Sequence, residues 1–258
     1  MSQINANVQR HASRAARYAI VIPAYNEAAT IRDVAARALA QVERVIVVDD
    51  GSSDGTAQAL SGLPVEVLRN AGNQGKAASL WRGAQCALEQ GAERIVTLDG
   101  DGQHLPEEIP RLLEAAERCP GCIVIGARSG DISAFPRSRY RANRVADFWI
   151  SWAAGRRIRD TQSGFRVYPA PLFRELRVRH DKSRSFVLES EILIEACRAG
   201  HRCVSVPVSA VYGQRPRRSH FRPVLDIARI VRMVALKLLA RGMNPAGLYR
   251  VLFRAPDG

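Results

Sequence analysis

Short apolar runs, each followed by a polar turn, recur along the first half of the chain. The runs are residues 18–23, 44–48, 65–68, 94–98 and 122–126. Continuous apolar runs of this length predict strands that are buried on both faces of a parallel sheet. Helical patterns separate them at 28–41, from Ser53 or Asp54 to Gly62, at 75–90 and at 106–118. Strands that alternate with helices predict a doubly wound α/β fold, whose ligands bind at the carboxyl ends of the strands.

The second half continues with a less regular pattern. We expect a loop at 129–141, a helix at 142–154, a strand at 161–168, a helix at 188–199 and a strand at 203–208. A basic loop at 212–223 precedes a last long helix. The 258 residues fit one large domain with an appendage, so we expect a flexible segment at 1–17, an α/β domain at 18–212 and a basic, helical tail at 213–258.

Acidic residues follow two of the predicted strands. Asp99, Asp101 and Gln103 come directly after the run at 94–98, and glycines separate them. Hard oxygen ligands in this arrangement suit Mg²⁺ or Mn²⁺ on a diphosphate, although an isolated Asp-x-Asp is more often a solvated turn. Asp49 and Asp50 end the run at 44–48, where a carboxylate can bind a ribose or base; the same residues would also suit a helix-capping turn.

The net charge is unusual for a folded protein of ordinary composition. The chain carries 38 Lys and Arg against 25 Asp and Glu, a net charge of +13, which predicts an anionic partner. Residues 137–166 contain eight arginines, and a second basic cluster covers 215–241. The five cysteines lack the spacing of a secreted disulfide framework, which fits a reducing compartment. Cys119-Pro-Gly-Cys122 has the spacing of a redox or zinc motif, but no second Cys or His pair accompanies it, so we interpret it as structural.

Several motifs occur together in one order. They are Val21-Ile-Pro-Ala-Tyr-Asn-Glu27, Val48-Asp-Asp-Gly-Ser-Ser-Asp-Gly-Thr56, Gly75-Lys76 and Leu98-Asp-Gly-Asp-Gly-Gln-His104. This set resembles the family-2 inverting glycosyltransferases, and Asp160-Thr-Gln-Ser-Gly-Phe-Arg166 narrows the likeness to the dolichyl- and polyprenyl-phosphate sugar synthases. The resemblance covers about residues 18 to 212 and implies a single GT-A domain, Rossmann-like, with a mostly parallel sheet and an amphipathic C-terminal extension.

The resemblance also implies roles for individual residues. A donor, GDP- or UDP-linked, would be bound by Pro23, Ala24, Tyr25, Glu27, Asp50, Gly75, Lys76, Asp99, Gly100 and Asp101. Asp99, Asp101 and Gln103 would hold the divalent metal, Mg²⁺ or Mn²⁺, on the donor diphosphate. A fixed cation there would stabilise the negative charge that develops on the leaving diphosphate.

The acceptor is expected to be a lipid-linked phosphate such as polyprenyl phosphate. Basic groups would hold such a phosphate, and the candidates are Arg128, Arg139, Arg141 and Arg166, with Ser163 as a hydroxyl donor. Any one of these arginines could equally be a solvated surface residue that binds no ligand. A hydroxyl acceptor would need a general base instead, for which Glu189 and Glu191 are candidates unless they form salt bridges on a helix surface. The predicted catalytic set is therefore Asp99, Asp101, Arg128, Arg166, Glu189 and Glu191.

The last long helix has an apolar arc opposite a mostly basic face. The apolar positions are Val224, Ile227, Ala228, Val231, Val234, Ala235, Leu238 and Leu239. Either an anionic membrane surface or the catalytic domain could cover that arc. No signal peptide or spanning segment is visible, so we expect a cytoplasmic protein, peripheral on the cytoplasmic face of a membrane. A nucleic-acid-binding module fits the charge but not the acidic strand ends, and an NAD-dependent oxidoreductase lacks its glycine-rich turn. We therefore expect no nucleic-acid partner.

Overall fold

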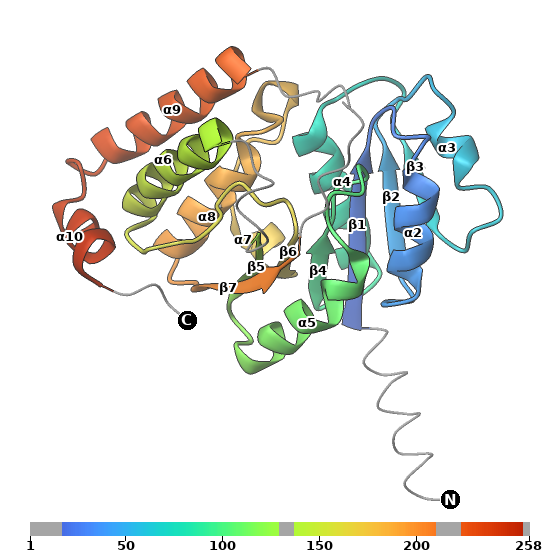
Figure 1. Ribbon diagram of the computed structural model, residues 1–258, viewed down its shortest axis with the longest axis horizontal. Coiled ribbons are helices and arrows are strands. Elements are labelled where there is room, and N and C mark those ends of the chain that lie inside the picture. Colours follow the sequence, from blue (N-terminus) through green and yellow to red (C-terminus); the bar gives the residue numbers. More distant parts are fainter. Residues whose placement is uncertain (1–16, 129–136, 210–222, 255–258) are drawn as a thin grey trace, which may run out of the picture.

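A central sheet of seven strands organises the protein. The computed structural model describes residues 17–128, 137–209 and 223–254. In it the strands lie in the order β3-β2-β1-β4-β6-β5-β7 (Figure 1). They are β1 (Tyr18–Ala24), β2 (Val45–Asp49), β3 (Glu66–Arg69), β4 (Arg94–Thr97), β5 (Ile123–Arg128), β6 (Arg166–Pro169) and β7 (Cys203–Val208). Only β6 runs antiparallel to its neighbours among these strands. The predicted α/β fold with a mostly parallel sheet is confirmed.

The apolar runs form strands because helices cover both faces of the sheet. Side chains alternate between the faces, so that Ile20 and Ile22 pack with α2 (Ile31–Leu39) and α5 (Ile109–Arg118). Val21 and Val48 face the other way, toward α4 (Lys76–Glu89) and α8 (Leu188–Arg198). Short helical segments α3 (Thr56–Ala59) and η1 (Pro106–Glu108) complete the first half.

The parallel strands bring the acidic residues to one edge of the sheet. Ala24 at the end of β1 pairs in register with Asp49 at the end of β2, and Val21 of β1 pairs with Thr97 at the end of β4. Asp50 and Asp99 therefore follow β2 and β4, the two strands that flank β1, at the same edge of the sheet. We call the strand-end residues Asp49, Asp50, Asp99 and Asp101 the acidic edge.

The second half differs from the prediction in three places. The strand expected at 161–168 begins only at Arg166, because the backbone and hydroxyl groups of Thr161 donate to Asp147, a residue of the preceding helix, instead of to a neighbouring strand. Helix α6 (Arg137–Ala154) begins five residues before the predicted 142, and the rest of the predicted loop, 129–136, lies outside the described residues. The prediction also lacked α7 (Leu172–Glu175), η3 (Lys182–Arg184) and α10 (Pro245–Phe253).

Helices α6, α9 (Pro223–Leu239) and α10 form an outer layer beside α8 (Figure 1). One side of α9 is buried through Ile230, Met233, Val234 and Leu238, and Lys237 pairs with Glu191 and Glu195 of α8. Its other side exposes Leu225, Ile227, Val231, Leu236 and Leu239. The apolar arc expected from the sequence is therefore only partly covered: Val234 and Leu238 pack on the domain, whereas Ile227, Val231 and Leu239 are exposed.

The cysteines divide into a bonded pair and free thiols. Cys119 and Cys122 form a disulfide across the turn between α5 and β5. Cys86, Cys197 and Cys203 are free. The Cys-Pro-Gly-Cys segment is thus a local cross-link, which cysteine spacing alone did not predict.

Candidate active site

Lys76 connects the acidic edge to α8. It is the first residue of α4, and its Nζ lies 2.7 Å from Asp99 Oδ1 and 2.9 Å from Glu189 Oε2. Burial by itself lowers the pKa of Lys76, but the two carboxylates outweigh that effect and raise the pKa above its usual value. Burial opposes ionisation of Asp99 as well, yet Lys76 holds the pKa of that carboxyl below its usual value. Lys76 and Asp99 are therefore charged at neutral pH.

Asp50 organises the loop that leads into Lys76. Its side chain is buried, and its Oδ1 accepts hydrogen bonds from Asn70 Nδ2 at 2.7 Å and from the Gln74 backbone N–H at 2.8 Å. Its Oδ2 accepts from the Gly75 backbone N–H at 2.8 Å. Gly75 has a φ of 90°, which L side chains rarely adopt, so this turn requires glycine. The predicted nucleoside ligand Asp50 thus lies beside Gly75 and Lys76, and its oxygens hold this loop.

The predicted metal ligands share one loop after β4. Asp101 Oδ1 accepts from the Gln103 backbone N–H at 2.9 Å, and the Asp99 side chain is 29% exposed. A Cβ on Gly164 would lie 2.7 Å from Asp99 Oδ2, so the backbone of that glycine forms a close wall against the carboxylate. In residues 17–128, 137–209 and 223–254, no three His, Cys, Asp or Glu side chains are grouped as metal ligands.

The chemistry of this loop still fits a divalent cation. Two carboxylates and a side-chain amide lie within five residues, and the ammonium of Lys76 already occupies a position against Asp99 where a cation is stabilised. Magnesium typically takes one or two protein carboxylates and completes its shell with phosphate oxygens and water. Asp99, Asp101 and Gln103 are therefore the residues that would hold the ion.

The segment after β1 is cross-linked to both acidic strand ends. The Asn26 N–H donates to Ser52 Oγ, and the Glu27 N–H donates to Thr56 Oγ1. Thr30 Oγ1 donates to the Gly100 carbonyl at 2.8 Å and contacts Glu27 Oε2 at 3.3 Å. This network places the predicted donor-binding residues at the acidic edge: Pro23 and Ala24 end β1, and Tyr25, Glu27 and Gly100 follow strands.

Arg128 ends β5 close to the same edge. Its Nε donates to Asp160 Oδ2 at 2.8 Å and its Nη2 to Asp160 Oδ1 at 2.6 Å, in a fork that is mostly buried. Asp147 fixes the loop that carries Asp160 by accepting hydrogen bonds from the backbone N–H groups of Asp160 and Thr161. His104 lies nearby, and burial lowers its pKa to about 4 against the opposing effect of Asp99, so it is neutral at neutral pH.

Arg166 lies beneath the surface of the site. It is fully buried, and its guanidinium donates to the Ser163 carbonyl at 2.8 Å, the Thr161 carbonyl at 2.8 Å and the Glu189 carbonyl at 2.7 Å. Ser163 is also buried, and its Oγ accepts from the Phe165 N–H at 3.3 Å. Both residues therefore shape the loop that carries Asp160, and Arg166 also positions the start of α8, which carries Glu189.

Two predicted residues lie apart from this cluster, and the side chain of a third is not described. Glu191 points to Lys237 of α9, with Oε1 2.9 Å from Nζ, and its Oε2 lies 3.7 Å from Arg184. Arg141 is exposed on α6, and the side chain of Arg139 lies outside the described residues. The salt-bridge alternative considered for Glu191 is thus the arrangement that the structure shows.

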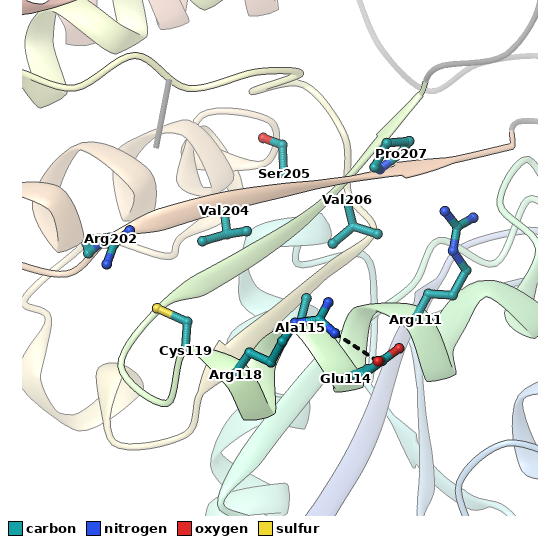
Figure 2. A pocket seen from close by; sticks show the side chains of 10 residues that line it. All are labelled: Arg111, Glu114, Ala115, Arg118, Cys119, Arg202, Val204, Ser205, Val206 and Pro207. Carbon is teal, nitrogen blue, oxygen red and sulfur yellow. Dashed lines mark hydrogen bonds and ion pairs between the residues drawn. The ribbon is translucent and has the colours of Figure 1, made fainter. Parts of the chain in front are cut away.

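A separate pocket lies beside α5, apart from the acidic edge. Figure 2 shows this pocket, of about 500 Å³, between α5 and the edge strand β7. Its lining includes Arg118, Arg202, Val204 and Val206 and none of the residues at the acidic edge. The chemistry described above therefore belongs to the strand ends and not to this pocket.

Comparison with known proteins shows the family of the chain. Residues 19–177 match the family model described as glycosyl transferase family 2. The chain belongs to glycosyl transferase family 2. A match of this length, over more than half of the 258 residues, shows that it is a glycosyltransferase, and the expected resemblance is confirmed.

Relatives within family 2 include enzymes named for lipid-linked phosphates. The chain is 30% identical over 205 residues to undecaprenyl-phosphate mannosyltransferase of Micrococcus luteus, covering 76% of this chain and 84% of that one. It is 28% identical over 205 residues to polyprenol monophosphomannose synthase of Mycolicibacterium smegmatis, covering 75% and 77%. It is 25% identical over 240 residues to a UDP-N-acetylglucosamine–dolichyl-phosphate N-acetylglucosaminyltransferase of Methanococcus voltae, covering 85% and 95%.

Solved structures share the fold. One is glucosyl-3-phosphoglycerate synthase of Mycobacterium tuberculosis in complex with Mn²⁺, UDP and phosphoglyceric acid. It superposes with a TM-score of 0.64 at 21% identity, and the match covers 87% of this chain and 78% of that chain. Mannosyl-3-phosphoglycerate synthase of Rubrobacter xylanophilus gives 0.62 at 20% identity, covering 87% and 74%. At this identity the likeness confirms the GT-A fold alone.

The groups that hold the site together in this family 2 enzyme were not among the predicted site residues. Asp147, Asp160, Asn70 and Ser185 all make contacts between segments that are distant in the chain. Asp160 begins the motif Asp160-Thr-Gln-Ser-Gly-Phe-Arg166, and its φ of 49° is that of a turn. The small and polar residues that follow it are typical of turns and could have indicated this. Nothing in the local sequence of α6 or η3 marked Asp147 or Ser185.

Proposed function

We propose that this family 2 glycosyltransferase moves a sugar from a GDP- or UDP-linked donor to a lipid-linked phosphate such as polyprenyl phosphate, with inversion at the sugar carbon and with a divalent cation. The observation that carries the proposal is the contact of Lys76 with Asp99 and Glu189 at the acidic edge, within a chain of this family. The relatives named for undecaprenyl and polyprenol phosphates support the acceptor class.

The donor diphosphate would lie over the acidic edge. Asp99, Asp101 and Gln103 would hold Mg²⁺ or Mn²⁺, which supplies positive charge where the leaving diphosphate becomes more negative. Lys76 adds a mostly buried ammonium near the diphosphate. The turn held by Asp50 keeps Gly75 and Lys76 fixed beside the nucleotide, which limits the reorganisation that binding requires.

The acceptor phosphate needs placement more than activation. Its second pKa is about 6, so a nucleophilic oxygen is already ionised near neutral pH. Arg128 at the end of β5 would bind this phosphate, and its fork to Asp160 orients the guanidinium. Arg166, which is buried, would act as a positioning residue for this loop.

A hydroxyl acceptor is the second candidate. Glu189 lies in the cluster, and its Oε1 is buried with no hydrogen-bond partner among the described residues. Glu189 would act as the base that takes the hydroxyl proton. Its other oxygen, Oε2, is already engaged in an ion pair with Lys76, however, which favours the phosphate acceptor.

The exposed side of α9 supports attachment to an anionic membrane surface. Ile227, Val231 and Leu239 are exposed on α9, and Tyr249 and Phe253 are exposed on α10. Arg229 and Arg232 lie on the same helix as the exposed apolar residues. Among the described residues, every helix is too short or too polar to cross a bilayer. We place the enzyme at the cytoplasmic face, where a lipid-linked acceptor would be within reach.

Product analysis tests the proposal. The purified protein is incubated with Mn²⁺, polyprenyl phosphate and each of a panel of GDP- and UDP-linked sugars, and lipid products are identified by mass. We expect one donor to give a polyprenyl-phosphate sugar, and no product when the lipid phosphate is replaced by the polyprenol. Transfer to the polyprenol or to a glycolipid hydroxyl, with none to the phosphate, would favour the second candidate.

A further inference from the structure

The ammonium of Lys76 stands where a metal bound to Asp99 would be attracted. Its Nζ is 2.7 Å from Asp99 Oδ1, a predicted metal ligand, and 2.9 Å from Glu189 Oε2. The side chain is 20% exposed, so water screens its charge only in part. A divalent ion on Asp99 would therefore meet a like charge at close range.

The backbone of Lys76 is held in place, whereas its side-chain amine can move. The Lys76 backbone N–H donates to Ser185 Oγ at 2.9 Å, and the preceding Gly75 N–H donates to Asp50. Four methylene groups separate this anchored backbone from Nζ, so the amine can exchange one anion for another while α4 stays in place. Glu189 keeps it within the site when it leaves Asp99.

We propose that Lys76 is an internal counter-cation that competes with the divalent metal for Asp99 and is released when a nucleotide diphosphate arrives. The diphosphate supplies new negative charge for Lys76, and Asp99 then becomes available to the metal. Metal and nucleotide consequently bind cooperatively, each raising the affinity for the other by the same factor. This inference rests on the proposed metal-dependent function.

Mn²⁺ binding measured by electron paramagnetic resonance tests the proposal. The signal of free Mn²⁺ is titrated with protein alone and with protein plus GDP or UDP, after correction for Mn²⁺ held by the nucleotide itself. We expect the wild-type protein alone to bind Mn²⁺ weakly, and either nucleotide to tighten binding by at least about tenfold. Lys76→Met should tighten Mn²⁺ binding without nucleotide by at least about tenfold, and should reduce the effect of the nucleotide.

Lys182→Met is the matched control. Lys182 lies in η3 beside Gly75, and its Nζ donates to the Asn73 carbonyl, so the same charge is removed near the site without contact to Asp99. Its Mn²⁺ affinity should stay within about twofold of the wild type, since exposed charges are screened. Glu189→Gln serves as a second variant in case Lys76→Met does not fold. It leaves Lys76 with Asp99 as its carboxylate partner, so Mn²⁺ binding without nucleotide should weaken.

The outcomes separate this inference from the proposed function. Nucleotide-dependent Mn²⁺ binding that is equal in wild type and Lys76→Met would overturn the role of Lys76 and leave the metal site standing. Unchanged Mn²⁺ affinity in Glu189→Gln would do the same. Failure of every variant to bind Mn²⁺ with GDP or UDP would overturn both.

Discussion

Replacing Asp50 with asparagine tests whether its carboxylate holds the loop before Lys76. Asp50 is only 2% exposed and accepts three hydrogen bonds, from Asn70 Nδ2 and from the backbone N–H groups of Gln74 and Gly75. In Asp50→Asn one carboxylate oxygen becomes an NH₂ group. If the remaining oxygen keeps Asn70 and Gln74, that NH₂ group faces the Gly75 N–H, and two donors meet.

The cost can be estimated from this geometry. One charge-assisted hydrogen bond is lost and a buried N–H is left without an acceptor, which together lower the free energy of unfolding by about 3 kcal/mol. For a chain of this size that corresponds to a fall in Tm of about 9 °C. Asp33→Asn is the matched control, because Asp33 is exposed on α2 and its surface ion pair with Arg37 contributes less than about 1 kcal/mol.

Thermal unfolding followed by circular dichroism measures the global effect, and hydrogen exchange of the Gln74 and Gly75 amides measures the local one. We expect a clear fall in Tm and faster exchange at both amides in Asp50→Asn, and neither change in Asp33→Asn. A Tm within about 2 °C of the wild type, with loss of nucleotide binding alone, would refute the reasoning and leave Asp50 as a ligand contact only.

Three further predictions follow from the same structure. Asp101→Ala should reduce transfer at least about a hundredfold while Tm stays close to that of the wild type, because Asp101 is partly exposed; near-normal turnover in a mass-based assay would contradict its role. Burial, with Glu66 beside it, raises the pKa of the Cys86 thiol to about 11, so at pH 8 iodoacetamide should alkylate it about a hundred times more slowly than an ordinary thiol, with the rate rising toward pH 11. Glu66→Gln should speed this reaction, and peptide mass mapping distinguishes Cys86 from the buried Cys197 and Cys203. Charge reversal at Arg229 and Arg232 should weaken binding to anionic liposomes, measured by sedimentation, by at least about thirtyfold, since two basic residues contribute about 1 kcal/mol each near such a surface, and unchanged binding would place the contact elsewhere.

The sequence predicted the first half of the fold because its signals are local. The strands at 18–24 and 45–49 are apolar on both faces, and parallel pairing then places Asp50 and Asp99 at one edge without further information. The second half depends on distant contacts. Thr161 donates to Asp147 of α6 rather than to a strand, and this shortens β6 in a way that a sequence pattern does not reveal.

The candidate site shows the same division. Asp99, Asp101 and Lys76 were identified from motifs, whereas the contact of Lys76 with Glu189 joins α4 to α8 across more than a hundred residues of chain. The burial of Arg166 could not be predicted, because an arginine is normally exposed unless several acceptors converge on it. In this chain three backbone carbonyls do so.

The location of the bound cation tests the account most directly. A crystal of the protein soaked with Mn²⁺ and GDP or UDP, and measured at a wavelength where manganese scatters anomalously, would locate the ion independently of any assay. We predict an anomalous peak beside the carboxylates of Asp99 and Asp101, with the diphosphate against it and the amine of Lys76 moved away from Asp99. A peak at any other part of the molecule, with the nucleotide bound there, would contradict the account.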